Sequence, residues 1–194
     1  AVMGPRSREL MRRVSTDDFS NEAFPFGTSR EIDLGYATVR ATRLTYVGEL
    51  GWELYVPVEM AVAVYEELEA AGRDLDLRDA GYYALESLRL EKGYRAWGRE
   101  LTPETTPVEA GLTFAVKPGK GVPFRGADAL RAAMAAGPKR RLASFVLADP
   151  AVMLWGGELI LRDGRPVGQL TSAAFGHCLG AAVGLGYVSR EDGV

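Results

Sequence analysis

Residues 43–57 constrain the fold more than any other stretch of this chain. Their sequence, Arg-Leu-Thr-Tyr-Val-Gly-Glu-Leu-Gly-Trp-Glu-Leu-Tyr-Val-Pro, has β-preferring side chains at both ends and two glycines in the middle. This pattern predicts a strand, a tight glycine turn and a second strand. Because the side chains of a strand alternate between its two faces, Trp52 is expected on one face and Glu53 and Tyr55 on the other.

Glu53 is the candidate binding residue of this hairpin. If its face lines a cavity, the carboxylate lies beside aromatic rings and can accept two parallel N–H bonds from a planar amino-oxo heterocycle. The alternative is a solvated surface glutamate, which is the commoner situation for an acidic side chain. This segment alone leaves both interpretations open.

The charge balance excludes several classes of partner. The chain has 194 residues and a net charge of -3, from 23 basic and 26 acidic residues, so it carries no electrostatic footprint for nucleic acid or an anionic membrane. No apolar run approaches the roughly 20 residues of a membrane span, and the first residues contain no apolar signal core. A single cysteine, Cys178, cannot form an internal disulfide. We therefore expect a cytoplasmic protein that binds no nucleic acid and no membrane.

The other periodic segments predict helices and strands in a mixed order. Apolar residues at helical spacing predict helices at 5–14, 58–72, 77–92 and 127–136. β-rich runs predict strands at 31–45, 112–117, 141–147, 158–162, 166–171 and 186–189, with a turn at Asp163–Gly164. Phe24-Pro25-Phe26 predicts a loop that packs two rings on an apolar surface.

The pattern of predicted elements changes at Gly137–Pro138, because strands and turns follow this point where helices were common before it. We therefore expect an α+β protein with an α/β domain over residues 1–136 and a small β-rich module, a partly closed barrel, over residues 137–194. The chain starts without an initiator methionine. We expect it to be a piece of a longer protein.

Most other polar residues have a structural interpretation. Arg89 falls on the buried helix 77–92, where a charge usually serves a hydrogen-bonded ion pair. His177 is the only histidine, and neighbouring residues on a strand point apart, so His177 and Cys178 predict neither a metal site nor a nucleophile pair. The glycine loop 118–123 lacks the residue order of a phosphate cradle. No metal is expected.

Four ordered blocks carry a resemblance to a known family. They are residues 46–57, residues 87–97 (Ser-Leu-Arg-Leu-Glu-Lys-Gly-Tyr-Arg-Ala-Trp), residues 106–112 (Thr-Pro-Val-Glu-Ala-Gly-Leu) and residues 123–126 (Pro-Phe-Arg-Gly). Together they resemble the folate-binding aminomethyltransferases of the glycine cleavage T-protein family, most of all the C-terminal folate domain of dimethylglycine and sarcosine dehydrogenases or oxidases. The resemblance implies a T-protein-like domain followed by a barrel-like C-terminal module.

The same resemblance implies a function. Tetrahydrofolate would be the cofactor, with Glu53 holding the pterin edge and Tyr46 beside the ring. The reaction would transfer a one-carbon group from an iminium derived from a methylated amine to tetrahydrofolate, in a parent chain joined to a flavin-dependent dehydrogenase domain. The rival hypothesis is a non-catalytic module of the same fold that binds no folate and serves assembly or interaction.

Three departures from the family pattern bear on this hypothesis. The family's catalytic aspartate lies upstream of the block that begins at Ala1, so no residue here inherits that role and we expect the isolated chain to be inactive. Leu85 stands where the T-protein branch has an arginine, which removes one folate contact. Tyr94 stands where the iron–sulfur maintenance branch has a cysteine, which argues against that branch.

Overall fold

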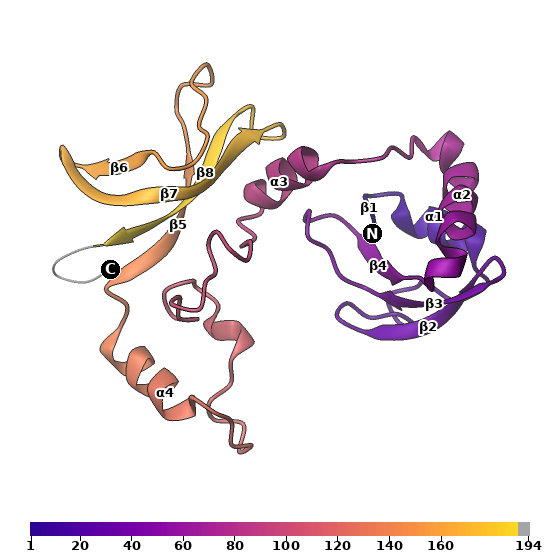
Figure 1. Cartoon of the computed structure of the whole chain (residues 1–194), viewed down its shortest axis with the longest axis horizontal. Coiled ribbons are helices and arrows are strands. Elements are labelled where there is room, and N and C mark those ends of the chain that lie inside the picture. The colour runs from indigo at the N-terminus through magenta and orange to yellow at the C-terminus, as the bar shows by residue number, and fades with distance from the viewer. Residues whose placement is uncertain (190–194) are drawn as a thin grey trace. The chain divides into compact units, whose positions relative to one another are not determined.

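A computed structural model of the chain describes residues 1–189 (Figure 1). The chain divides into two compact units, residues 1–85 and residues 86–194. Both units combine helices with antiparallel sheet, which confirms the expected α+β class. The predicted domain boundary after residue 136 stays a prediction.

The first unit contains a four-stranded antiparallel sheet in the order β1-β4-β3-β2. Its strands are β1 (Val2–Met3), β2 (Ser29–Leu34), β3 (Ala37–Thr42) and β4 (Gly51–Tyr55). In β3 the residues at 37, 39 and 41 are buried and those at 38 and 40 are exposed, so one face of the sheet packs on the core.

Positions 48 and 51 of the central stretch require glycine for two different structural reasons. Gly48 has a φ of +79°, a left-handed conformation that side chains rarely adopt. Gly51 pairs with Met3 of β1, and a Cβ at this position would lie 2.6 Å from the Met3 Cγ. Only the second strand predicted within residues 43–57 is present, as β4. The predicted first strand is wrong, because β3 ends at Thr42 and residues 43–50 form a loop in place of a strand and a tight turn.

Two helices cover the first unit as the apolar spacing predicted. They are α1 (Ser7–Val14) and α2 (Ala61–Gly72), and the short 3-10 turns η1 (Val58–Met60) and η2 (Arg73–Leu75) flank the second. The helices α1 and α2 pack against each other (Figure 1). Leu10, Met11 and Val14 of α1 are buried, because their spacing places them on one helical face.

Three aromatic rings form the centre of the first unit's core. The Trp52 ring lies 5.4 Å from the Phe19 ring and 6.2 Å from the Phe24 ring, both in edge-on geometry. All three side chains are almost completely shielded from solvent. The sequence predicted that the rings of Phe24 and Phe26 both pack on an apolar surface. This is wrong for Phe26, which is 67% exposed.

The second unit holds another four-stranded antiparallel sheet, in the order β5-β8-β7-β6. Its strands are β5 (Arg140–Val146), β6 (Leu159–Arg162), β7 (Arg165–Gly176) and β8 (Ala181–Ser189). Asp163 and Gly164 both have positive φ and join β6 to β7, which confirms the predicted turn. Helix α4 (Ala127–Ala136) has the predicted bounds.

Two sequence-based predictions in the middle of the chain differ from the structure, the first in where a helix begins and the second in the type of element. The helix predicted at 77–92 is α3 (Tyr82–Glu91), which begins five residues later than expected and crosses the division between the units. The strand predicted at 112–117 is instead the 3-10 turn η3 (Thr113–Ala115). The Ala115 and Val116 amides donate to the carbonyls of Leu112 and Thr113, three residues back, so they are used locally rather than in a β-ladder.

A buried ion pair organises the second unit. Arg89 of α3 and Glu100 are both fully shielded from solvent, and Arg89 Nη1 donates to Glu100 Oε2 at 2.8 Å. The same guanidinium donates to the Tyr94 carbonyl at 2.8 Å, to Ser172 Oγ at 2.7 Å and to Glu86. This confirms the structural interpretation of Arg89; its partner Glu100 was not predicted.

The carboxylate of Glu100 also connects the loop around Ala96 to strand β7 through hydrogen bonds. Thr171 of β7 donates its hydroxyl to Glu100 Oε1 at 2.7 Å, and the Ala96 amide donates to Oε2 at 2.9 Å. Burial raises the pKa of the Glu100 carboxyl, but hydrogen bonds from Ser172, Thr171 and Ala96 and the charge of Arg89 outweigh it. The net result is a pKa below the ordinary value, so Glu100 is ionised in the folded state.

Replacing the central indole should destabilise the first unit strongly. We expect Trp52→Ala to lower the free energy of unfolding by about 3–5 kcal/mol, because it empties a packed aromatic site. Tyr36→Ala, in the turn between β2 and β3, is the control, since Tyr36 is completely exposed, and it should change stability by no more than about 0.5 kcal/mol. Urea unfolding followed by circular dichroism measures both, and equal effects would contradict this description of the core.

Removing the buried negative charge should destabilise the second unit in a pH-dependent way. We expect Glu100→Gln to lower the free energy of unfolding by about 3–5 kcal/mol at pH 7, because Arg89 loses its buried counter-charge. Since the folded-state pKa of Glu100 is lowered, this stabilisation is complete above the ordinary glutamate value of about 4.3. It is lost as the pH falls through the lower folded-state pKa.

The difference between the wild type and Glu100→Gln should therefore shrink as acid is added, which urea unfolding at a series of pH values measures. Glu104→Gln, an exposed site with the same charge change, should cost no more than about 0.5 kcal/mol at pH 7. A difference that is constant down to acidic pH would contradict the ionised pair.

Candidate functional site

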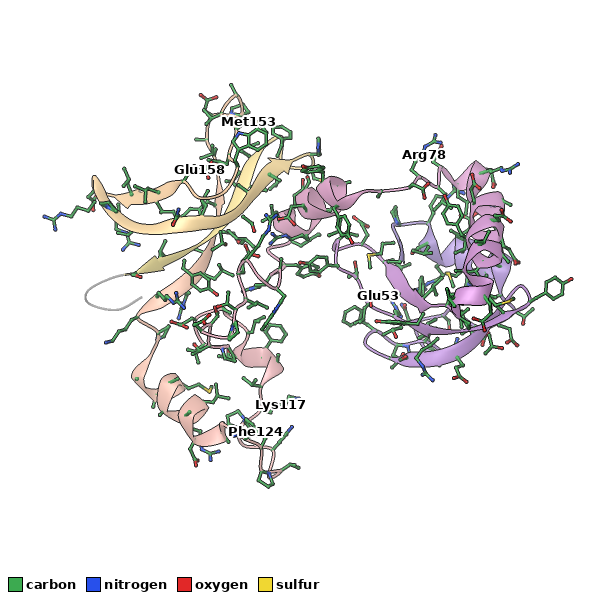
Figure 2. All side chains as sticks on the ribbon, viewed as in Figure 1. Glu53, Arg78, Lys117, Phe124, Met153 and Glu158 are labelled. Carbon is green, nitrogen blue, oxygen red and sulfur yellow. The ribbon has the colours of Figure 1, made fainter. Side chains whose placement is uncertain are left out.

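Glu53 lies on β4 (Figure 2). It directly follows the buried Trp52, so the alternation along the strand places it on the opposite face. It is paired with Thr42 of β3 in the antiparallel register. Its side chain is half-buried, and Tyr55 donates its hydroxyl to Glu53 Oε2 at 3.1 Å. The predicted alternation is confirmed, because the carboxylate and an aromatic ring share a face.

Tyr46 lies in the loop 43–50 rather than on a strand. Its side chain is half-buried, and the neighbouring Val47 amide donates to Thr45 Oγ1 at 3.3 Å. The end of this loop is anchored, because the Leu50 carbonyl accepts a hydrogen bond from Ser7 Oγ at 2.9 Å. The assignment of Tyr46 and Glu53 to ligand binding stays a prediction.

The Glu53 carboxylate keeps acceptor capacity beyond its contact with Tyr55. The hydrogen bond to Glu53, together with its charge, raises the pKa of the Tyr55 phenol, so the phenol is a donor at neutral pH. An ionised carboxylate offers about four acceptor positions on two oxygens. With Oε2 engaged by Tyr55, the group can still accept N–H bonds from a ligand that lies along its edge.

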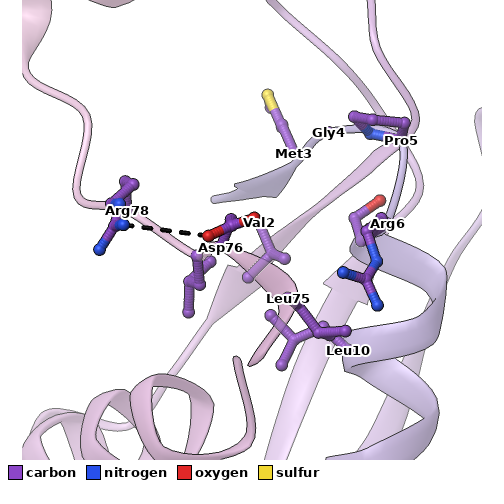
Figure 3. A pocket seen from close by; sticks show the side chains of 11 residues that line it. Val2, Met3, Gly4, Pro5, Arg6, Leu10, Leu75, Asp76 and Arg78 are labelled. Atoms are coloured by element: carbon purple, nitrogen blue, oxygen red, sulfur yellow. Dashed lines mark ion pairs between the residues drawn. The ribbon is translucent and has the colours of Figure 1, made fainter. Parts of the chain in front are cut away.

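A pocket of about 460 Å³ occupies another part of the same unit (Figure 3). Its lining comes from β1, the start of α1, the end of η2 and the residues that follow it, and includes Val2, Leu10 and Leu75. The Arg78 and Asp76 side chains form a loose ion pair at 3.9 Å beside it. The lining contains neither Tyr46 nor Glu53, so this pocket and the predicted site are different places.

Leu85 and Tyr94, two of the three departures from the family pattern, occupy ordinary positions. Leu85 is half-buried on α3, and an aliphatic side chain there cannot donate the charged hydrogen bond of an arginine. The Tyr94 backbone accepts from Arg89 and donates to the Arg89 carbonyl at 2.9 Å. Tyr94 therefore takes part in the buried network of the second unit.

Residues 1–189 contain no group of three or more His, Cys, Asp or Glu side chains that could hold a metal ion. His177 is exposed beside the Phe175 ring, at 5.3 Å, and Cys178 is exposed with its amide donating to Glu91 Oε1 at 2.7 Å. Over the same described residues, none of the helices combines the length and the apolarity that a membrane crossing requires.

Sequence reasoning missed one charged cluster. Arg8 of α1 and Arg43 of the central loop both donate to the side-chain oxygen of Asn21. These residues come from three separate segments with no shared motif. No periodicity or spacing in the sequence could have brought them together.

Comparison with known proteins gives the family. The family model of the GCVT N-terminal domain matches residues 1–120, and that of the glycine cleavage T-protein C-terminal barrel domain matches residues 140–193. Human mitochondrial sarcosine dehydrogenase is 44% identical over 193 residues, which are 100% of this chain and 21% of that protein. The mouse mitochondrial pyruvate dehydrogenase phosphatase regulatory subunit is 40% identical over 192 residues, covering 96% of this chain and 22% of that protein.

A solved structure agrees with both family models. The aminomethyltransferase T of the glycine cleavage system from Bartonella henselae superposes with a TM-score of 0.82 at 31% identity, covering 96% of this chain and 50% of that one. The chain thus spans about half of this protein and about a fifth of the two relatives above. With family models matched over both its parts and a T-protein fold, the chain belongs to the glycine cleavage T-protein family.

Proposed function

We propose that this chain binds tetrahydrofolate and forms part of a unit that transfers a one-carbon group from a methylated-amine-derived iminium to tetrahydrofolate. The observation that carries the proposal is the Glu53 carboxylate, held by Tyr55 on an accessible face of β4. Membership of a family that includes aminomethyltransferases supports it.

The donor and acceptor pattern of a pterin fits this carboxylate. A pterin edge presents a ring N–H and an exocyclic amine side by side, and a carboxylate accepts such a pair in a fork geometry. Tyr55 restricts the rotation of the Glu53 side chain through its bond to Oε2. We infer that Glu53 orients the ring and that Tyr46 lies beside it.

The chain's own contribution would be binding and orientation. When bound, tetrahydrofolate would supply the nitrogen that takes up the one-carbon group. Holding the acceptor nitrogen near the reacting carbon converts an encounter in solution into a reaction between oriented groups. Glu53 fixes the acceptor through hydrogen bonds remote from the reacting nitrogen, so its effect is on positioning.

We propose a parent protein that joins this module to a flavin-dependent amine dehydrogenase domain and works in the cytoplasm. The likeness to human sarcosine dehydrogenase supports the dehydrogenase linkage. That relative carries the word mitochondrial in its name, so the compartment is an independent question. Fractionation of the source cells followed by detection of the parent protein decides it.

The alternative function is a non-catalytic interaction module. The likeness to a pyruvate dehydrogenase phosphatase regulatory subunit, at 40% identity, favours it, because that protein is named for regulation rather than catalysis. The two functions differ in whether the chain binds folate. Titration with a reduced folate therefore separates them.

Glu53→Gln should weaken folate binding. We expect isothermal titration of folinate into the wild type to give saturable binding, and the variant to bind at least about tenfold more weakly. A neutral amide oxygen accepts less strongly than a carboxylate, and the amide NH2 of glutamine would face the N–H donors of the pterin. Glu49→Gln is the matched control, an exposed glutamate of the same hairpin with the same charge change. It should bind like the wild type.

Two results would count against the proposal. If Glu53→Gln binds as tightly as the wild type, the site assignment is wrong. If the folded wild type shows no binding, the interaction module becomes the better account.

The hydrogen bond between Tyr55 and Glu53 can be measured separately. Because the Glu53 carboxylate raises the pKa of the Tyr55 phenol, we expect Glu53→Gln to lower that pKa and Glu49→Gln to leave it unchanged. NMR titration of tyrosines labelled with ¹³C at the ring Cζ, with Tyr55→Phe to assign the signal, measures it. An identical Tyr55 titration in the wild type and Glu53→Gln would show that the two side chains are not bonded in solution.

A further inference from the structure

Two arginines of the first unit share one neutral acceptor. Arg8 Nη2 donates to Asn21 Oδ1 at 2.6 Å, and Arg43 Nη2 donates to the same oxygen at 2.8 Å. Arg8 belongs to α1, Asn21 to the loop between α1 and β2, and Arg43 to the loop before β4. The fold thus brings two positive charges to a single amide side chain.

The other contacts of Arg43 are with neutral groups. Arg43 Nη1 donates to the Phe24 carbonyl at 2.7 Å, and its guanidinium lies 6.0 Å from the Trp52 ring. Within residues 1–189, neither Arg8 nor Arg43 forms an ion pair with a carboxylate. Other arginines of this unit do, as Arg13 shows with Asp74.

The surroundings make this imbalance unfavourable. Both guanidinium groups are half-buried, and their Nε atoms are shielded from solvent and have no hydrogen-bond partner among the described residues. Burial lowers the pKa of Arg43, and the nearby charge of Arg8 lowers it further. Like charges that are partly removed from water repel each other strongly, and a neutral amide oxygen supplies no counter-charge.

We propose that Arg8, Arg43 and Asn21 form a binding site for a small oxyanion, the carboxylate or phosphate group of a small ligand. Guanidinium groups present planar forks that match these groups in a bidentate manner. The Asn21 side chain is exposed, so the cluster is reachable from solvent. The site is independent of Glu53, because a carboxylate selects N–H donors and two arginines select the opposite charge.

A purely structural role for the arginines is the competing explanation. In that case they only fasten the loop at Asn21 to α1 and to the central loop. Asn21→Asp separates the two roles, because it keeps both arginines and the side-chain volume while placing a carboxylate between them. A built-in anion should occupy the site and exclude an added one.

The test is calorimetric titration of the 194-residue chain with sodium phosphate and with sodium acetate, at ionic strength held constant with sodium chloride. We expect the wild type to bind phosphate or acetate, and the one that binds more tightly identifies the preferred group. Asn21→Asp and Arg8→Gln should each weaken binding at least tenfold. Arg12→Gln is the matched control, an exposed arginine of the same helix, and should bind like the wild type.

Thermal unfolding gives a second readout. We expect the preferred anion to raise the Tm of the wild type and of Arg12→Gln, but not that of Asn21→Asp. If Arg8→Gln does not fold, Asn21→Asp still decides the question, since it retains both positive charges. Absence of anion-specific binding by the wild type, or wild-type affinity in Asn21→Asp, would overturn the proposal.

Discussion

Burial of Trp52 determines where Glu53 can lie. The indole packs against Phe19 and Phe24 and is completely shielded from solvent. Because strand side chains alternate, a slip of one residue in β4 would bury the carboxylate and expose the indole. The pairing of Gly51 with Met3 fixes the same register from the other side, since only glycine fits beside β1. The candidate site therefore depends on the core beneath it.

Local sequence patterns predicted many of the helices, strands and turns. They failed where contacts between distant segments determine the structure of a segment or the partner of a residue. Helix α4 and the Asp163–Gly164 turn follow from spacing and turn chemistry alone. Residues 112–117 have strand-like composition, but they bond locally instead of joining a sheet. The partner of Arg89 could not be predicted, because Glu100 lies in an irregular loop whose position is set by the contacts themselves.

The candidate site likewise has features that the sequence predicted and features that it did not. Alternation along β4 placed Glu53 and Tyr55 on one face, and their hydrogen bond confirms that arrangement. Tyr46 was assigned by resemblance alone, and its loop has no periodicity to predict from. The arginine pair at Asn21 was missed altogether, because three distant segments meet only in the folded chain. Charge balance in space, rather than any motif, revealed it.

A crystal structure of this chain with folinate would show directly whether Glu53 holds the pterin. We expect the pterin ring N–H and exocyclic amine about 3 Å from the Glu53 carboxylate oxygens, with the Tyr55 hydroxyl still bonded to Oε2. Folinate bound instead in the pocket beside Leu10 and Leu75, with no contact to Glu53, would show that Glu53 is not the folate-binding residue.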